Sequence, residues 1–332
     1  MSRVYGSVFL QTNLGAFGLS PRKPGTVRSI HSSKIHEPQM KEGRASRTAE
    51  YMALFRALES TRPADRRLFD DRFATAFLTA RLRPVVSLSR ISCLGSLIRS
   101  FIDHRWPGAR TSAVARTRFI DDAAAAALGS GVEQVVILGA GFDARAYRVP
   151  AMTRVPVFEA DHPATSAAKR SAVEAALGSI PSHVHFVPID FNTESLPDTM
   201  TAAGYDPRRR TAFLWEGVTN YLSADAVDRT LRWCARAAAA SKVIFTYVDR
   251  QVLDAPRTFE GIGKILATLR ASGERWTFGL DPSTLSDFLA QRGLVLDDDV
   301  GAADYRARYF QLAARGMRGY EFYRIAVAHV PE

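Results

Sequence analysis

The sequence predicts an α/β fold in which a mostly parallel, Rossmann-like sheet follows a group of helices. After residue 131, short apolar runs alternate with helical segments, which is the pattern of strands linked by crossover helices. The runs are apolar at nearly every position, as expected for parallel strands covered on both faces. A glycine-rich loop directly follows the first run and precedes a helical segment. Together these features predict a nucleoside-binding sheet.

Residues 1–43 are rich in glycine, serine, proline and basic residues and show no sustained periodicity, so we expect a basic arm. The first 47 residues hold eight basic and two acidic side chains, which accounts for six of the ten net positive charges of the chain. The rest is only mildly basic and has no basic helix interleaved with aromatic residues. We therefore expect no nucleic-acid partner.

No apolar run reaches the roughly 18 residues that a membrane helix needs, so we expect no membrane partner. The two cysteines, Cys93 and Cys234, lie far apart and form no CxxC pair. This usage fits a reducing cytoplasm. The composition does not indicate the oligomeric state.

Residues 44–130 are predicted to form a helical cap ahead of a domain at 131–332. Apolar side chains recur there at spacings of three and four, with Ser46 as the expected cap of the first helix. The first two stripes are Tyr51, Leu54, Phe55 and Leu58, and then Phe69, Phe73, Phe77 and Leu78. A longer helical stretch over 85–106 is expected to break near Gly95, and a further helix covers 111–128.

Seven strands are expected in the second domain, the last of them antiparallel. Their ranges are 134–138, 156–159, 185–189, 212–215, 242–247, 294–296 and 320–330. Helices are expected between them, for example over 164–177 and 224–240.

The loop Gly139-Ala140-Gly141-Phe142-Asp143 follows the first strand. Glycines there permit a tight turn and a close backbone approach to a ligand. With Ala144, the loop also fits the dinucleotide pattern G-x-G-x-x-G/A, so a structural turn, a dinucleotide site and a methyl-donor site all remain open.

Acidic residues stand at the ends of the next two strands. Asp161, beside Glu159, lies twenty residues after Gly141 and can accept hydrogen bonds from ribose hydroxyls. Asp190 and Phe191 can bind an adenine amine and cover its ring, although Asp190 could simply form a turn. Dinucleotide sites do not generally need this third acid. The glycine loop also follows a long cap and precedes no separate hydride-transfer domain, which argues against NAD.

Several segments resemble the leucine carboxyl methyltransferase family, and most closely its bacterial S-adenosyl-L-methionine-dependent branch. The similar segments are Arg47-Thr48-Ala49-Glu50, residues 56–60, 68–71, 136–148 and 158–163, and residues 215–222. The resemblance covers roughly residues 45–330. It implies a class I methyltransferase sheet and S-adenosyl-L-methionine as cofactor.

The resemblance also implies roles for individual residues. Arg116 would hold the methionyl carboxylate of the donor, and Gly139 and Gly141 would lie under the methionyl group. Asp161 would bind the ribose, Asp190 and Phe191 the adenine, and Glu216 would lie near the ammonium and sulfonium. Ala140, Asp143 and Glu159 are expected at the same site.

No histidine lies between Phe186 and Ala328, where a base on the later strand ends would stand. An acceptor that is already acidic is therefore favoured, either a carboxylate or an acidic hydroxyl of a small molecule. Glu216, Tyr221 and His104 are the alternatives for a protein base. We expect no metal. An NAD(P)-dependent oxidoreductase and an inert nucleoside-binding partner protein are the competing hypotheses.

Overall fold

The computed structural model describes residues 47–332, apart from 192, 256–258, 260–261 and 311–317. A single seven-stranded sheet has the order β3-β2-β1-β4-β5-β7-β6. The first five strands are parallel, and β7 pairs antiparallel with β5 and β6. The predicted α/β fold with an antiparallel last strand is confirmed. The expected arm at 1–43 and the Ser46 cap lie outside the described residues.

All seven expected strands are present, with bounds shifted by a few residues at most of the ends. They are β1 Gln134–Leu138, β2 Val157–Asp161, β3 Val184–Pro188, β4 Thr211–Trp215, β5 Lys242–Val248, β6 Val295–Val300 and β7 Tyr323–His329. The central strands β1 and β4 are buried at every position, which explains their continuous apolar sequence.

Alternate side chains of β1 enter different cores on the two faces of the sheet. Val136 and Leu138 pack in the core that α8, α9 and α12 cover. Val135 and Ile137 pack in the core that α5 and α6 cover. These helices are α5 Ala109–Gly129, α6 Arg145–Arg148, α8 Leu196–Ala202, α9 Ala224–Cys234 and α12 Leu285–Ala290.

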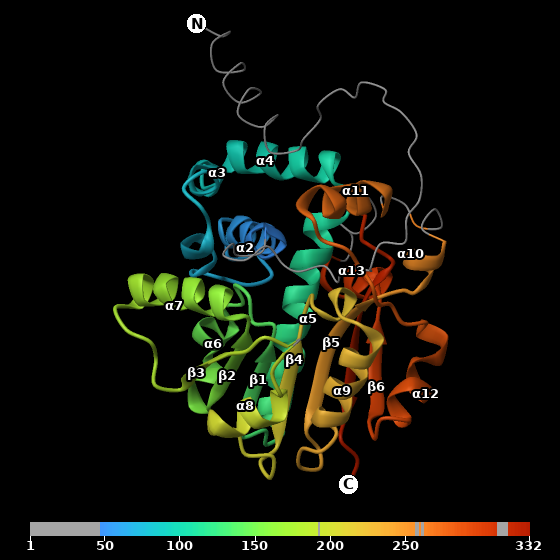
Figure 1. Ribbon diagram of the computed structural model, residues 1–332. Helices are drawn as coiled ribbons and strands as arrows, with labels where there is room; N and C mark the ends of the chain where they lie inside the picture. The colour runs from blue at the N-terminus through green and yellow to red at the C-terminus, as the bar shows by residue number, and fades with distance from the viewer. Residues whose placement is uncertain (1–46, 192, 256–258, 260–261, 311–317) are drawn as a thin grey trace, which may run out of the picture.

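The segment before the sheet forms helices that lie above one end of it (Figure 1). They are α2 Arg47–Ser60, α3 Arg83–Ser89 and α4 Ser92–Arg105, and α5 then runs from them down onto the sheet. The remaining helices are α7 Pro163–Leu177, α10 Gln251–Asp254, α11 Ile262–Ser272 and α13 Ala302–Phe310. Short 3-10 helices are η1 Ala74–Phe77, η2 Pro150–Arg154, η3 Thr219–Tyr221 and η5 Pro282–Thr284. In Figure 1, α11 lies at the same end of the sheet as α2 and α4, so the segment between β5 and β6 also reaches this end.

Two helical predictions in the cap were wrong. The break expected near Gly95 falls between α3 and α4, at residues 90 and 91. A Cβ on Gly95 would lie 2.3 Å from the Ser89 carbonyl oxygen, so this glycine permits the close approach of the two helices instead of ending one. The stripe from Phe69 to Leu78 contains only η1, because the Asp71 carboxylate accepts the amide hydrogens of Phe73 and Ala74 and makes a turn.

The helix expected over 224–240 ends early, at Cys234. The alanines that follow satisfied the helical pattern but form a turn, in which Ala240 has a φ of 62°. This turn places Ser241 so that its hydroxyl accepts the amide hydrogen of Thr211 in β4. The buried hydrogen bond favours the turn over another helical turn of alanines.

Candidate active site

The glycine loop lies at the carboxyl end of β1. Gly139 and Gly141 have φ values of 65° and 43°, which strongly favour glycine. A Cβ on Gly139 would lie 2.3 Å from Val218 Cγ2, so the loop packs directly against the segment that follows β4. Ala140 is buried, and its amide donates to the Ala160 carbonyl oxygen of β2. The loop is therefore held between the ends of β2 and β4.

Asp161 ends β2 and contacts the glycine loop. Its Oδ2 accepts the Gly141 amide hydrogen at 2.5 Å, and Oδ1 accepts that of His162 at 2.6 Å. Burial raises the pKa of Asp161, although these two amides and nearby charges oppose the shift. The carboxylate thus couples the end of β2 to the loop.

Glu159 belongs to the interior instead. It is 1% exposed, with Oε1 lying 2.9 Å from Lys169 Nζ, and its Oε2 accepts the Tyr147 hydroxyl at 3.0 Å. Burial raises the pKa of Glu159, and Lys169 opposes that effect. Of the two β2 acids in the expected set, Asp161 is the one beside the glycine loop.

The end of β3 carries Asp190 and Phe191. Both side chains are half-buried, and Phe191 packs against the core on the α8 and α9 face. The Asp190 amide donates to Glu194 Oε2 at 2.7 Å, and the Asp190 carbonyl oxygen accepts the amides of Thr193 and Glu194. The Asp190 backbone therefore forms a turn after β3, at the same edge of the sheet as Asp161.

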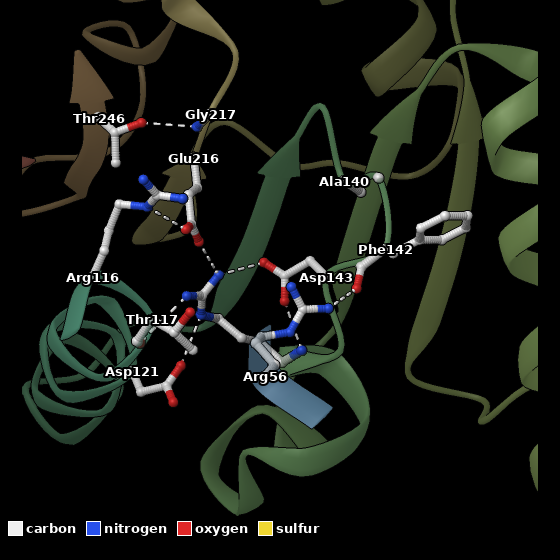
Figure 2. A network of polar contacts seen from close by, with 12 residues as sticks. Arg56, Arg116, Thr117, Asp121, Ala140, Phe142, Asp143, Glu216, Gly217 and Thr246 are labelled. Atoms are coloured by element: carbon white, nitrogen blue, oxygen red, sulfur yellow. Dashed lines mark hydrogen bonds and ion pairs between the residues drawn. The ribbon is translucent and has the colours of Figure 1, made fainter. Parts of the chain in front are cut away.

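Glu216 follows β4 and lies between two arginines that come from different elements. Arg116 Nε on α5 donates to Glu216 Oε1 at 2.7 Å, and Arg145 Nη1 on α6 donates to Oε2 at 2.8 Å. Figure 2 shows the Arg116 and Glu216 side chains turned toward each other, with Asp143 nearby. Burial alone would raise the pKa of Glu216, but the two guanidinium groups outweigh it, and the pKa is lowered.

Arg116 has further contacts that fix its plane. Its guanidinium carbon lies 4.6 Å from the centre of the Tyr323 ring, and Nη2 lies 3.4 Å from Met52 Sδ on α2. The adjoining Gly217 has a φ of 76°, and its amide donates to Thr246 Oγ1 at 2.8 Å (Figure 2). Helix α5, helix α2 and strands β5 and β7 thus all meet at the end of β4.

Asp143 closes the glycine loop. Its Oδ1 accepts the Arg145 amide hydrogen at 2.8 Å, and Oδ2 accepts Arg145 Nη1 at 2.5 Å. Burial opposes ionisation, but Arg145, Lys169 and Arg56 lower the pKa of Asp143 to about 2. Arg56 on α2 also donates to the Phe142 carbonyl oxygen, so the cap contacts the loop itself (Figure 2).

Tyr221 lies in η3, a few residues beyond Glu216. Its hydroxyl donates to Glu274 Oε2 at 3.3 Å, and Thr48 on α2 donates to the same oxygen at 2.7 Å. Burial, followed by the Glu274 carboxylate, raises the pKa of Tyr221 above its usual range. His104, the other alternative base, is exposed on α4.

Three residues at this site were missed by the sequence analysis: Arg56, Arg145 and Glu274. The Asp143-Ala144-Arg145 spacing was a usable signal, because an acid two residues before an arginine can bond both its amide and its guanidinium. Glu274 gave no signal, since it comes from the distant loop after α11. Within the described ranges, no group of three or more His, Cys, Asp or Glu residues could hold a metal ion.

The model of the leucine carboxyl methyltransferase family matches residues 49–235, which is more than half of the chain. This protein belongs to that family. A Parafrankia relative, assigned by its name to the S-adenosyl-L-methionine-dependent methyltransferases, is 32% identical over 321 residues, covering 90% of this chain and 95% of its own. A similarly named Frankia alni relative is 37% identical over 208 residues, covering 62% and 70% of the two chains.

The leucine carboxyl methyltransferase family uses S-adenosyl-L-methionine, so that molecule is the cofactor of this protein and the oxidoreductase alternative is not favoured. A crystal structure from Thermobifida fusca, named as that of a methyltransferase, has a TM-score of 0.54 at 16% identity, covering 83% of this chain and 97% of its own. A DUF574 family protein from Streptomyces avermitilis has a TM-score of 0.50 at 14% identity, covering 82% and 100%. These likenesses show the shared fold.

Along the part of the chain that is described, none of the helices combines the length and apolarity of a membrane span.

Proposed function

We propose that this family member transfers the methyl group of S-adenosyl-L-methionine to an oxygen of a small acidic molecule, either a carboxylate or an acidic hydroxyl. The donor occupies the carboxyl edge of β1 to β4, where the glycine loop, Asp161, Asp190 and Glu216 follow consecutive parallel strands. Asp161 receives the ribose hydroxyls, and Asp190 with Phe191 receives the adenine.

Arg116 and Glu216 form the methionyl end of this proposed donor site. The guanidinium binds the donor carboxylate through hydrogen bonds that suit its planar geometry. Glu216 keeps its negative charge and accepts a hydrogen bond from the donor ammonium. The close packing of Gly139 against Val218 supports this arrangement. It brings the glycine loop next to the segment after β4, so that both can contact the short methionyl part of the donor.

One observation carries the choice of an acidic acceptor: both expected catalytic residues are in the wrong state to act as a base. Glu216 is held ionised between two arginines, and its lowered pKa makes it a weak proton acceptor. Tyr221 has a raised pKa and therefore keeps its proton, and its hydroxyl donates a hydrogen bond to Glu274. An acceptor that arrives ionised needs neither of them as a base.

In the proposed step, an acceptor oxygen lone pair forms the new bond to the methyl carbon. The carbon–sulfur bond breaks, and its electron pair stays on sulfur, which becomes the neutral thioether of S-adenosylhomocysteine. The protein aligns the acceptor oxygen, carbon and sulfur and keeps water out of the site. Tyr221 and Glu274 lie where the cap, η3 and the loop after α11 meet, and we assign them to acceptor positioning.

The test separates the three function hypotheses. Calorimetry should show binding of S-adenosylhomocysteine and none of NADH. Methyl-labelled donor should then be incubated with a panel of aromatic and aliphatic carboxylic acids and phenols, with aliphatic alcohols and amines as the comparison. We expect labelled methyl esters or ethers from the acidic members. Donor binding without transfer to any acceptor class would favour the inert binder, and transfer to amines would contradict oxygen methylation.

A further inference from the structure

Arg145 is a buried cation at the centre of the candidate site. Its side chain is 2% exposed, and its guanidinium contacts three carboxylates from three elements. Nε donates to Asp121 Oδ1 on α5 at 2.8 Å, whereas Nη1 contacts Asp143 Oδ2 at 2.5 Å and Glu216 Oε2 at 2.8 Å. Nη2 completes the set with the Thr117 carbonyl oxygen at 3.4 Å.

The guanidinium is anchored on the side away from Glu216. Asp121 also accepts two hydrogen bonds from Arg148, each at 2.7 Å, so its position on α5 is fixed by two arginines. The Asp143 carboxylate holds the Arg145 amide as well as its side chain. Arg145 thus has little freedom to turn, and the Nη1 group that reaches Glu216 is fixed by the rest of the fold.

We propose that Arg145 is a positioning residue of the donor site, which fixes the Glu216 carboxylate in its ionised form and in the orientation that receives the donor ammonium. This inference rests on the proposed role of Glu216. Arg145 acts through Glu216 and Asp143, because its own guanidinium is buried and bonded to both carboxylates.

The electrostatics agree with this geometry. Glu216 faces Arg116 from α5, Arg145 from α6, Asp143 from the glycine loop and the Tyr323 ring from β7. Burial and Asp143 favour its neutral form, whereas the two arginines favour the charged form and outweigh them. Arg116 is also the group proposed to hold the donor carboxylate. In the donor complex Arg116 is then shared between Glu216 and the donor carboxylate, whereas the hydrogen bond from Arg145 Nη1 to Glu216 Oε2 involves no donor atom.

The first test is a double-mutant cycle on S-adenosylhomocysteine affinity, using Arg145→Lys, Glu216→Gln and the double variant at pH 7.5. Arg145→Lys keeps the charge but loses the planar set of donors. We expect it to weaken binding about ten- to a hundred-fold, the range of a lost charge-assisted hydrogen bond. In the Glu216→Gln background, Arg145→Lys should weaken S-adenosylhomocysteine binding by less than about three-fold, because the carboxylate through which Arg145 acts is gone.

Arg148→Lys is the matched control. Arg148 belongs to the same short helix, is similarly buried and shares Asp121, but it has no hydrogen bond to Glu216 in the described contacts. It should lower the melting temperature about as much as Arg145→Lys and change donor affinity by less than about three-fold. Equal affinity losses in the two lysine variants, with no coupling to Glu216, would assign Arg145 a purely structural role.

The second test leaves Arg145 in place and does not depend on the folding of its variants. The affinity ratio between the native protein and Glu216→Gln should stay constant from pH 5.5 to 8, because an Arg145-paired Glu216 remains ionised throughout. Any titration of Asp161 is common to both proteins and cancels in the ratio. A ratio that falls toward one as the pH drops would show Glu216 taking up a proton and would overturn the proposal. Failure of the native protein to bind S-adenosylhomocysteine at all would instead overturn the proposed function, and the inference with it.

Discussion

Arg116 Nε lies 2.7 Å from Glu216 Oε1, although 100 residues separate the two in the chain. This ion pair joins the helix that leaves the cap to the end of β4. Because Nε is used by Glu216, the two Nη groups form the edge that can meet a donor carboxylate. Stacking on Tyr323 holds the plane of that edge.

Arg116→Lys is expected to weaken S-adenosylhomocysteine binding about ten-fold, since a lysine keeps the charge but cannot bond Glu216 and the donor carboxylate at once. Calorimetry at pH 7.5 measures the change. Arg118→Lys is the control on the same helix, because Arg118 is half-buried and its guanidinium bonds Asp122 and the Leu68 carbonyl oxygen instead of Glu216. Identical affinities in the two variants would contradict the role given to Arg116.

Asp161→Ala should cost about 2–3 kcal/mol of donor binding, the size of a lost charge-assisted hydrogen bond. Asp161→Asn should cost less, because the amide oxygen can still accept from Gly141. In the native protein, burial raises the pKa of Asp161, so protonation begins at a higher pH than for a free aspartate. Donor affinity should then fall as the pH is lowered through that pKa, and Asp161→Asn should lack this fall. Unchanged affinity in a folded Asp161→Ala protein would refute the ribose assignment.

Gly139→Ala should destabilise the fold and weaken donor binding together. Its Cβ would lie 2.3 Å from Val218 Cγ2, whereas a Cβ on Gly178 would meet no atom within 4 Å, although Gly178 also has a positive φ of 81°. Gly178→Ala therefore measures backbone strain alone, about 1–2 kcal/mol. Overpacking should add about 1–3 kcal/mol at Gly139. Urea unfolding measures the loss of stability in both single variants. The extra loss in Gly139→Ala, relative to Gly178→Ala, should disappear in the double variant Gly139→Ala/Val218→Ala. If the extra loss of stability persists in the double variant, the Val218 contact is not its cause.

The pH dependence of kcat tests the acidic acceptor. A free carboxylic acid titrates near pH 4, so a carboxylate acceptor should give a nearly flat kcat from about pH 6 to 8. Glu216→Gln, Tyr221→Phe and Glu274→Gln should lower kcat or raise KM without introducing or removing a titration in that range. A rising limb in a rate limited by chemistry, lost in Glu274→Gln, would instead identify a hydroxyl acceptor with Glu274 as its base.

The sequence predicted the central strands of the sheet well because these strands are buried on both faces. β1 and β4 have apolar side chains at nearly every position, and this pattern follows from burial alone. The helical cap was harder to predict. The Phe69 to Leu78 stripe has helical spacing, yet the Asp71 side chain bonds the backbone and replaces the helix with a turn.

The sequence alone determined where the strands lie along the chain, and it identified the glycine loop and the acids at the strand ends. It also identified the family that these motifs resemble. Only the tertiary structure decided which acids belong together: Glu159 pairs with Lys169 in the interior, whereas Glu216 lies between Arg116 and Arg145. The physical reason is that the charge state of a buried carboxylate depends on its spatial neighbours. In this fold those neighbours come from α5, α6 and the glycine loop. These segments lie far from Glu216 in the sequence, so no local sequence pattern predicts that they contact it.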